Sequence, residues 1–197
     1  EGEHDSVDSY VCAHVVTCPD CGTDIPLVSK WSIRTRRSAD TVISVPEVAE
    51  DGSIGYDCLI EPTEEELDEF DHKQGTVSRG GDAECLNCGI VTESEDIVEM
   101  HQEGDFSYDI ICVRYMSSSG NYSFRAPNEA DYEALTSAEQ RIESDFDLAS
   151  FLTTPLPEGE KTREPREHGI HEWRDMFTPR QLVSHYEYYR SFEDKKD

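Results

Sequence analysis

Two Cys-x-x-Cys-Gly motifs constrain the fold of this chain more than any other feature of its sequence. The first contains Cys18 and Cys21, the second Cys85 and Cys88, and each pair is followed directly by glycine. A two-residue spacer lets both thiolates of a pair converge on one ion, and the glycine permits the tight turn that directs backbone N–H groups at sulfur. Four thiolates in tetrahedral geometry suit Zn²⁺ and leave no open coordination position. The spacing therefore predicts one structural zinc site formed by Cys18, Cys21, Cys85 and Cys88.

The two motifs are separated by residues 22–84, a longer gap than the ~15–20 residues of a compact zinc motif. The gap is tolerable because the entropy of loop closure grows only logarithmically with length. Two disulfides, two redox pairs or metal-free thiols are the alternatives, although no secretion signal indicates an oxidising compartment. His168 and His171 are weaker candidate ligands, for which a surface or capping role is favoured. The other cysteines lie in apolar, β-rich segments and are predicted core residues: Cys12, Cys58 and Cys112.

Acidic residues dominate the charge of the chain, with 44 Asp and Glu against 17 Lys and Arg and a net charge of −27. Few of the basic residues are lysines, and the carboxylates are distributed over nearly every segment. This composition predicts a protein from an extreme halophile, because concentrated salt screens the self-repulsion. An acidic partner of a basic protein, or a nucleic-acid mimic, is the alternative. No apolar run is long enough for a membrane span and no signal segment opens the chain, which predicts a cytoplasmic protein without membrane contacts.

Segments with strand and helix patterns predict an α+β fold: a zinc-ribbon β core with a long β-rich insertion and flanking helices. Strands are expected over residues 10–17, 25–33, 41–48, 54–60, 108–116 and 121–125, and helices over 63–70, 94–102, 128–143 and from Thr178 onward. The chain is expected to begin with a loose segment over residues 1–9, followed by a zinc-ribbon-containing β-rich domain over 10–125. A helical segment over 126–152, a linker over 153–167 and a C-terminal helix region over 168–197 are expected to follow.

Four stretches, taken in order, resemble the adenine-specific DNA methylases that contain a zinc ribbon. They are Cys18–Val28, Gly75–Gly81 with the knuckle that follows, Tyr122–Tyr132 and Gly169–Val183. The resemblance covers residues 10–192 and implies methyl transfer from S-adenosylmethionine to the N6 of an adenine flipped out of the duplex. It also implies a place in a restriction-modification or phage-defence system.

The resemblance covers only the central region of that family. Its members carry a glycine-rich cofactor loop upstream and an Asp/Asn-Pro-Pro-Tyr/Phe catalytic motif downstream, and this chain contains neither. The chain also begins without Met and ends inside an expected helix, which favours a piece of a longer protein. No catalytic residue is therefore assigned, and the region is expected to be inert alone, with DNA and the rest of the methylase chain as its partners. A non-enzymatic zinc-ribbon adaptor that binds nucleic acid or protein is the alternative function.

Two further groups of residues are candidate binding sites. Phe177, Thr178 and Pro179 are similar to the Phe-Thr-Pro motif that lines the cofactor pocket of many N6-adenine methyltransferases, and a capped helix N-terminus would favour the methionine carboxylate. The alternative is that Thr178 only caps its helix. The densest basic cluster of the chain consists of Arg34, Arg36 and Arg37. Because arginines can pair with phosphate, this cluster is a candidate nucleic-acid contact. The alternative, which is favoured, is that these arginines pair with local carboxylates.

Overall fold

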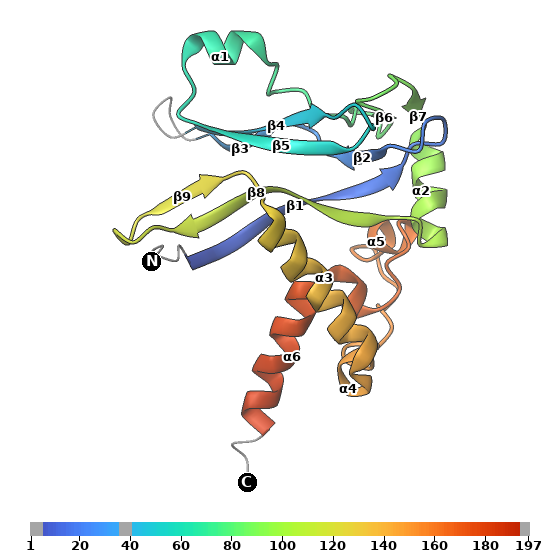
Figure 1. Cartoon of the computed structure of the whole chain (residues 1–197). Coiled ribbons are helices and arrows are strands. Elements are labelled where there is room, and N and C mark those ends of the chain that lie inside the picture. Colours follow the sequence, from blue (N-terminus) through green and yellow to red (C-terminus); the bar gives the residue numbers. More distant parts are fainter. Residues whose placement is uncertain (1–5, 36–40, 194–197) are drawn as a thin grey trace. The chain divides into compact units, whose positions relative to one another are not determined.

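Helices and several antiparallel sheets together build the chain (Figure 1), as expected for an α+β protein. The computed structural model describes residues 6–35 and 41–193. The chain folds into two compact units. Of the described residues, the first comprises those up to Met100 together with Asp105–Pro127, and the second comprises His101–Gly104 together with those from Asn128 to Glu193.

The larger sheet of the first unit has four antiparallel strands in the order β2-β1-β8-β9. These strands are β1 (Ser6–Thr17), β2 (Asp24–Leu27), β8 (Ser107–Met116) and β9 (Tyr122–Arg125). The central pair joins distant parts of the chain, because Ser6 of β1 pairs with Met116 of β8. The register shifts between Val11 and Cys12, which marks a β-bulge in the long strand β1.

A second sheet, in the order β3-β4-β5, is formed by strands that lie between the two cysteine motifs in the sequence. It is formed by β3 (Ser32–Thr35), β4 (Thr41–Val48) and β5 (Ile54–Ile60), and the short helix α1 (Glu64–Glu69) follows. Thr63 and Glu66 form a capping box at the start of α1, as the sequence predicts. A small third sheet pairs β6 (Ala83–Glu84) with β7 (Val91–Thr92).

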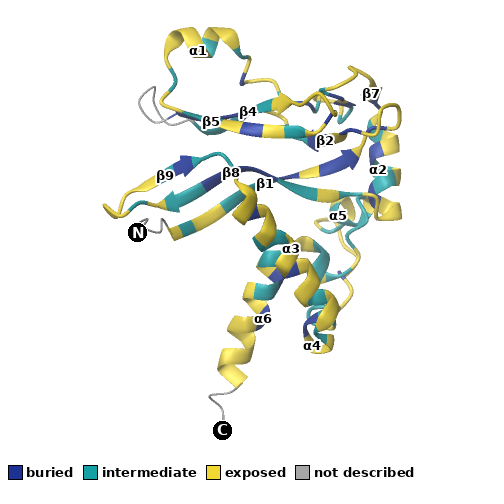
Figure 2. Cartoon of the chain, in the orientation of Figure 1, coloured by how far each residue is buried: buried dark blue, intermediate teal, exposed yellow. Residues whose placement is uncertain are grey.

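Apolar side chains from the first and second sheets form a shared core. The largest mixed cluster combines Ala13 and Ile111 of the first sheet with Ile43 and Tyr56 of the second, and Trp31 lies in the same cluster. Figure 2 shows buried stretches on β1 and β8 of the first sheet, and the first four residues of β4 in the second sheet are also buried. The hydroxyl of Ser44 in β4 donates a hydrogen bond of 2.6 Å to the carbonyl of Ile111. The segment between the cysteine motifs therefore contributes to the main core.

The second unit is helical and has a separate core. Its elements are α3 (Glu129–Ser144), α4 (Phe146–Ala149), α5 (Arg163–Glu167), the 3₁₀ helix η2 (Trp173–Met176) and α6 (Pro179–Glu193), together with the last residues of α2 (Ser94–Glu103). Leu148, Leu182 and Tyr186 are buried together at its centre. Asn128 caps α3 by accepting a hydrogen bond from the backbone N–H of Asp131, in line with the sequence pattern.

Three segments differ from the sequence expectations. Residues 25–33 form two strands in different sheets, because the backbone of Val28 and Ser29 bonds to Val77 and Gly75 instead of continuing the strand. Residues 6–9, expected to be loose, extend β1 because its partner β8 continues to Met116. The expected linker contains α5 and the buried Leu156, whose N–H donates to the carbonyl of His171 at 2.7 Å.

Within the part of the chain that the structure describes, no helix is both long enough and apolar enough to cross a membrane.

Candidate metal centre

The first cysteine pair lies in the turn between β1 and β2. The N–H of Cys18 donates to the carbonyl of Thr23 at 2.8 Å, and the N–H of Gly22 donates to the carbonyl of Cys18 at 3.0 Å. Gly22 has a φ of +75°, a left-handed conformation that costs glycine little and other residues more. The glycine after the pair therefore closes a tight knuckle around Cys18 and Cys21.

The second pair lies between β6 and β7 and repeats this geometry. The N–H of Cys85 donates to the carbonyl of Ile90 at 2.9 Å, and that of Gly89 donates to the carbonyl of Cys85, also at 2.9 Å. Gly89 has the same φ of +75° as Gly22. Two locally equivalent knuckles thus form from two similar sequences.

The fold brings the four predicted ligands together. The Sγ atoms of Cys18 and Cys88 are 3.7 Å apart, and those of Cys21 and Cys85 are 3.6 Å apart. All four sulfurs lie within 4.8 Å of one another. A regular tetrahedron with Zn–S bonds of ~2.3 Å has sulfur–sulfur edges of ~3.8 Å. The cluster therefore has the size and donor chemistry of a tetrathiolate metal site.

The pKa of the Cys21 thiol is shifted in the opposite direction to the pKa values of the Cys85 and Cys88 thiols. Hydrogen bonds from the side chain and backbone of Thr23 lower the pKa of Cys21 to about 6. At Cys88 the Ile90 backbone lowers the pKa, but desolvation and the three neighbouring thiols outweigh it and raise the pKa to about 12. Burial is the main cause that raises the pKa of Cys85. Neighbouring thiolates repel one another, and a bound cation would offset this repulsion.

Contacts outside the sulfurs also hold the two knuckles together. The side-chain amide of Asn87 donates to the hydroxyl of Thr23 at 3.0 Å. A Cβ atom on Gly52, at the turn between β4 and β5, would lie only 2.9 Å from that hydroxyl. Cys18 and Cys85 are both buried in one apolar cluster with Val16, Ile25, Ala83 and Ile97. The four-cysteine cluster is therefore built into the core at Cys18 and Cys85 and exposed at Cys21 and Cys88.

The two motifs come together because the segment before the second motif, residues 75–77, hydrogen-bonds to the segment that follows the first, residues 26–29. After the second sheet and α1, the N–H of Gly75 donates to the carbonyl of Ser29 at 3.1 Å, and that of Val77 donates to the carbonyl of Val28 at 3.0 Å. The Thr76 hydroxyl donates to the carbonyl of Pro26 and also accepts from the N–H of Val28. Residues 75–77 therefore place the second knuckle beside the first.

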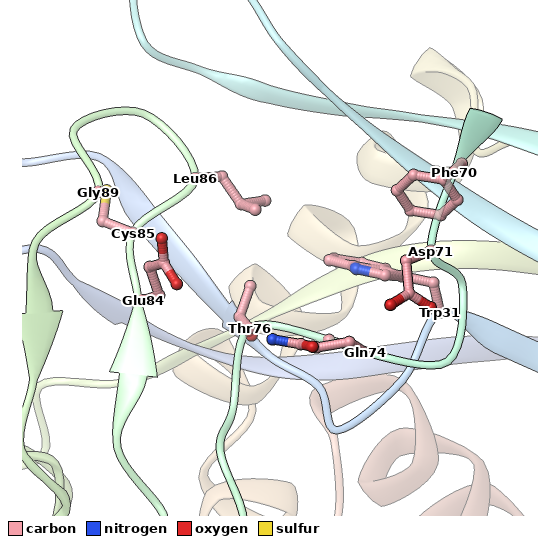
Figure 3. A pocket seen from close by; sticks show the side chains of 10 residues that line it. Trp31, Phe70, Asp71, Gln74, Thr76, Glu84, Cys85, Leu86 and Gly89 are labelled. Atoms are coloured by element: carbon pink, nitrogen blue, oxygen red, sulfur yellow. The ribbon is translucent and has the colours of Figure 1, made fainter. Parts of the chain in front are cut away.

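A pocket of about 400 Å³ lies beside the second knuckle. Figure 3 shows the rings of Trp31 and Phe70 at one end of this pocket, with Cys85 and Glu84 at the other. Asp71 is a second carboxylate in its lining, which otherwise contains Gln74, Gly75, Thr76, Leu86 and Gly89. The lining contains two carboxylates and no Lys or Arg, so this pocket does not favour phosphate.

The predicted cofactor residues lie at the start of α6. The N–H of Thr178 donates to Oε1 of Gln181 at 3.0 Å, and the Thr178 hydroxyl accepts from the N–H of Gln181 at 3.4 Å. The Phe177 ring lies 4.8 Å from that of His185 and packs against the core of the second unit, while Pro179 is the first residue of α6. These contacts are those of a capped helix N-terminus.

The predicted arginine cluster is described only at Arg34. Its guanidinium carbon lies 6.0 Å from the centre of the Phe124 ring, in the range of a cation–π contact. Arg36 and Arg37 lie outside the described residues. His168 ends α5 and its ring lies 5.6 Å from that of His101.

Sequence reasoning missed one juxtaposition. Cys58 and Cys112, each assigned to the core separately, have their Sγ atoms 3.7 Å apart. Only their placement in β-rich, apolar segments was visible in the sequence, and nothing there pairs one with the other.

Comparison of the chain with known protein families, with characterised proteins and with solved structures finds no significant match.

Proposed function

We propose that Cys18, Cys21, Cys85 and Cys88 bind one structural Zn²⁺ at the centre of a zinc-ribbon core. The observation that carries this proposal is the convergence of four sulfurs within 4.8 Å on two knuckles of the same geometry. A site with four cysteine ligands has no position left for water or substrate, so this metal serves stability and not catalysis.

Metal analysis of the purified chain tests the site. We expect one zinc per chain in the wild type and a large loss in Cys88→Ser, an exposed ligand. Cys12→Ser is the matched control, because Cys12 lies outside the cluster. Cobalt substitution of the wild type should also give the strong visible absorption of tetrahedral thiolate coordination. Folded wild-type protein with well under one zinc per chain would contradict the assignment.

We further propose that the chain is the zinc-stabilised central region of a DNA adenine-N6 methyltransferase, with a structural or DNA-recognition role. The support is the ordered resemblance of the four stretches named above, which include the first knuckle and the segment before the second. In this proposal the cofactor loop and the catalytic motif lie in the rest of the methylase chain, which binds S-adenosylmethionine, and Phe177, Thr178 and Pro179 border the cofactor site.

The coding sequence on both sides of this region provides the first test. A glycine-rich loop upstream and an Asp/Asn-Pro-Pro-Tyr/Phe motif downstream are expected, and the absence of both would favour the zinc-ribbon adaptor instead. The extended protein should then transfer labelled methyl groups to unmethylated duplex DNA in multimolar KCl. Thr178→Ala should weaken S-adenosylmethionine binding, whereas Thr178→Ser, which keeps the capping hydroxyl, should not. Equal cofactor affinity in both variants would remove Thr178 from the proposed site.

The proposed DNA contact is tested separately. Replacing Arg34, Arg36 and Arg37 together with Ala should reduce the DNA affinity of the extended protein more than Arg79→Ala, a substitution of an exposed arginine outside the cluster. Unchanged affinity in the triple variant would limit this region to a structural role.

A further inference from the structure

Cys58 and Cys112 lie on two separate sheets. Cys58 lies in β5, the edge strand of the second sheet, and Cys112 lies in β8, an inner strand of the first. Their sulfurs are 3.7 Å apart although 53 residues separate them in sequence. The adjoining strands are fixed by other contacts between the sheets, including a hydrogen bond of 2.8 Å from the hydroxyl of Tyr56 to the carboxylate of Asp109.

The two cysteines differ in exposure. Cys112 is fully buried beside Val42 and Phe124, whereas Cys58 is half-buried at the edge of the same apolar cluster. Among the residues that the structure describes, no further His, Cys, Asp or Glu joins these two to make a group of metal ligands. Two thiols in contact, without further ligands, have the chemistry of a dithiol.

We propose that Cys58 and Cys112 form a redox-active dithiol, which a low-molecular-weight disulfide converts into a disulfide bond between the two sheets. This dithiol is independent of the zinc centre and of the proposed methylase role. The sulfurs must approach from 3.7 Å to ~2.05 Å for the bond to form. Cys58, on an edge strand with only one neighbour, is the residue whose backbone can adjust.

The difference in exposure assigns an order to the two thiols. The thiolate of Cys58 attacks one sulfur of the small disulfide, which gives a mixed disulfide and releases one small thiol. Cys112 then loses its proton and attacks the Cys58 sulfur, which releases the second small thiol. The two protein thiols are oxidised by two electrons, and the small disulfide is reduced to two thiols that take up the two protons.

Electrostatics supports the same order. The hydrogen bond from the Cys112 thiol lowers the pKa of Cys58, although desolvation and the carboxylate of Asp57 oppose this effect. The Cys58 contact, together with burial, raises the pKa of Cys112. Cys58 is therefore the thiol that ionises first and faces the oxidant, and Cys112 is the resolving thiol.

Peptide mapping tests the proposal on the zinc-loaded full chain. The protein is incubated with oxidised glutathione, remaining thiols are blocked with a maleimide in denaturant, and the chain is cut before aspartates. This cleavage places Cys58 on residues 57–67 and Cys112 on residues 109–130, away from Cys85 and Cys88 on residues 82–95. We expect a crosslinked pair of the first two peptides, with the zinc content unchanged.

Thermal unfolding gives a second readout. Oxidation should raise the midpoint by on the order of 5–10 °C, because the bond constrains the unfolded chain. The shift should persist in Cys12→Ser and disappear in Cys58→Ser. Three results would each overturn the proposal. They are a mixed disulfide with glutathione that stays on Cys58, a crosslink of Cys58 to Cys12, and unmodified Cys58 and Cys112 after an incubation in which the protein keeps its zinc.

Discussion

Close approach of two backbones at Gly75 decides whether the second knuckle can reach the first. A Cβ atom at this position would lie 2.0 Å from the carbonyl oxygen of Val28 and 2.7 Å from the backbone N of Lys30. Neither neighbour is the flexible end of a side chain, so the backbone itself would have to move. Glycine is needed here for space.

Gly75→Ala should therefore destabilise the protein by about 1–3 kcal/mol, the usual cost of overpacking. Gly55→Ala is the matched control, because nothing lies within 4 Å of the site where its Cβ would be. Denaturant unfolding of the zinc-loaded proteins measures both effects. Equal stability of the two variants would show that the backbone of Val28 and Lys30 leaves room for a side chain at position 75.

At the scale of elements, the helices of the second unit depend on one small cluster. Leu148 of α4 is fully buried there with Leu182 and Tyr186 of α6, and Ile142 of α3 packs against them. Phe146, two residues before Leu148, is by contrast 83% exposed. A short helix of four residues thus supplies the central side chain of this core.

Leu148→Ala should cost about 2–5 kcal/mol, because it removes a buried side chain and leaves a cavity. Phe146→Ala should change the stability little. Neither substitution should lower the zinc content, because the four cysteines belong to the first unit. Helical circular dichroism and metal analysis of the same samples measure the two effects, and zinc loss in Leu148→Ala would contradict this separation.

The sequence predicts elements well where the signal is local. The capping boxes at Thr63 and Asn128 depend on residues three positions apart, and both helices begin where expected. The split of residues 25–33 into β2 and β3 was not predictable, because it depends on hydrogen bonds to Gly75 and Val77, distant in sequence. The four cysteines of the candidate metal site were recognisable because each pair has its own short spacing, whereas Cys58 and Cys112 have no such pattern.

For the whole molecule, the net charge of −27 is the dominant electrostatic property. Some carboxylates are balanced locally, such as Asp8 by Arg114 and Glu187 by Arg141, but 44 acidic residues share only 17 Lys and Arg. The excess acidic groups repel one another over a screening length of ~10 Å in 0.1 M salt and ~3 Å in 1 M salt.

We therefore expect the midpoint of thermal unfolding to rise when KCl is increased from about 0.1 M to about 1 M, as repulsion is screened. Sucrose at matched osmolality is the control, because it stabilises by exclusion from the surface and does not screen charge. The electrostatic origin would be contradicted if the midpoint rose as much in sucrose as in KCl, or if it did not change in KCl. Either result would remove the support for adaptation to salt.

The pairing of β1 with β8 has a consequence for how the protein forms during synthesis. The ribosome releases β1 and the first knuckle long before β8, whose pairing with β1 completes the larger sheet. Pairing between such distant segments is intrinsically slow. With the proposed zinc site, we expect Cys18 and Cys21 to remain reduced in the nascent chain until Cys85 and Cys88 have emerged. The yield of correctly folded protein should then depend on zinc supply and on a thiol-protecting environment at that stage.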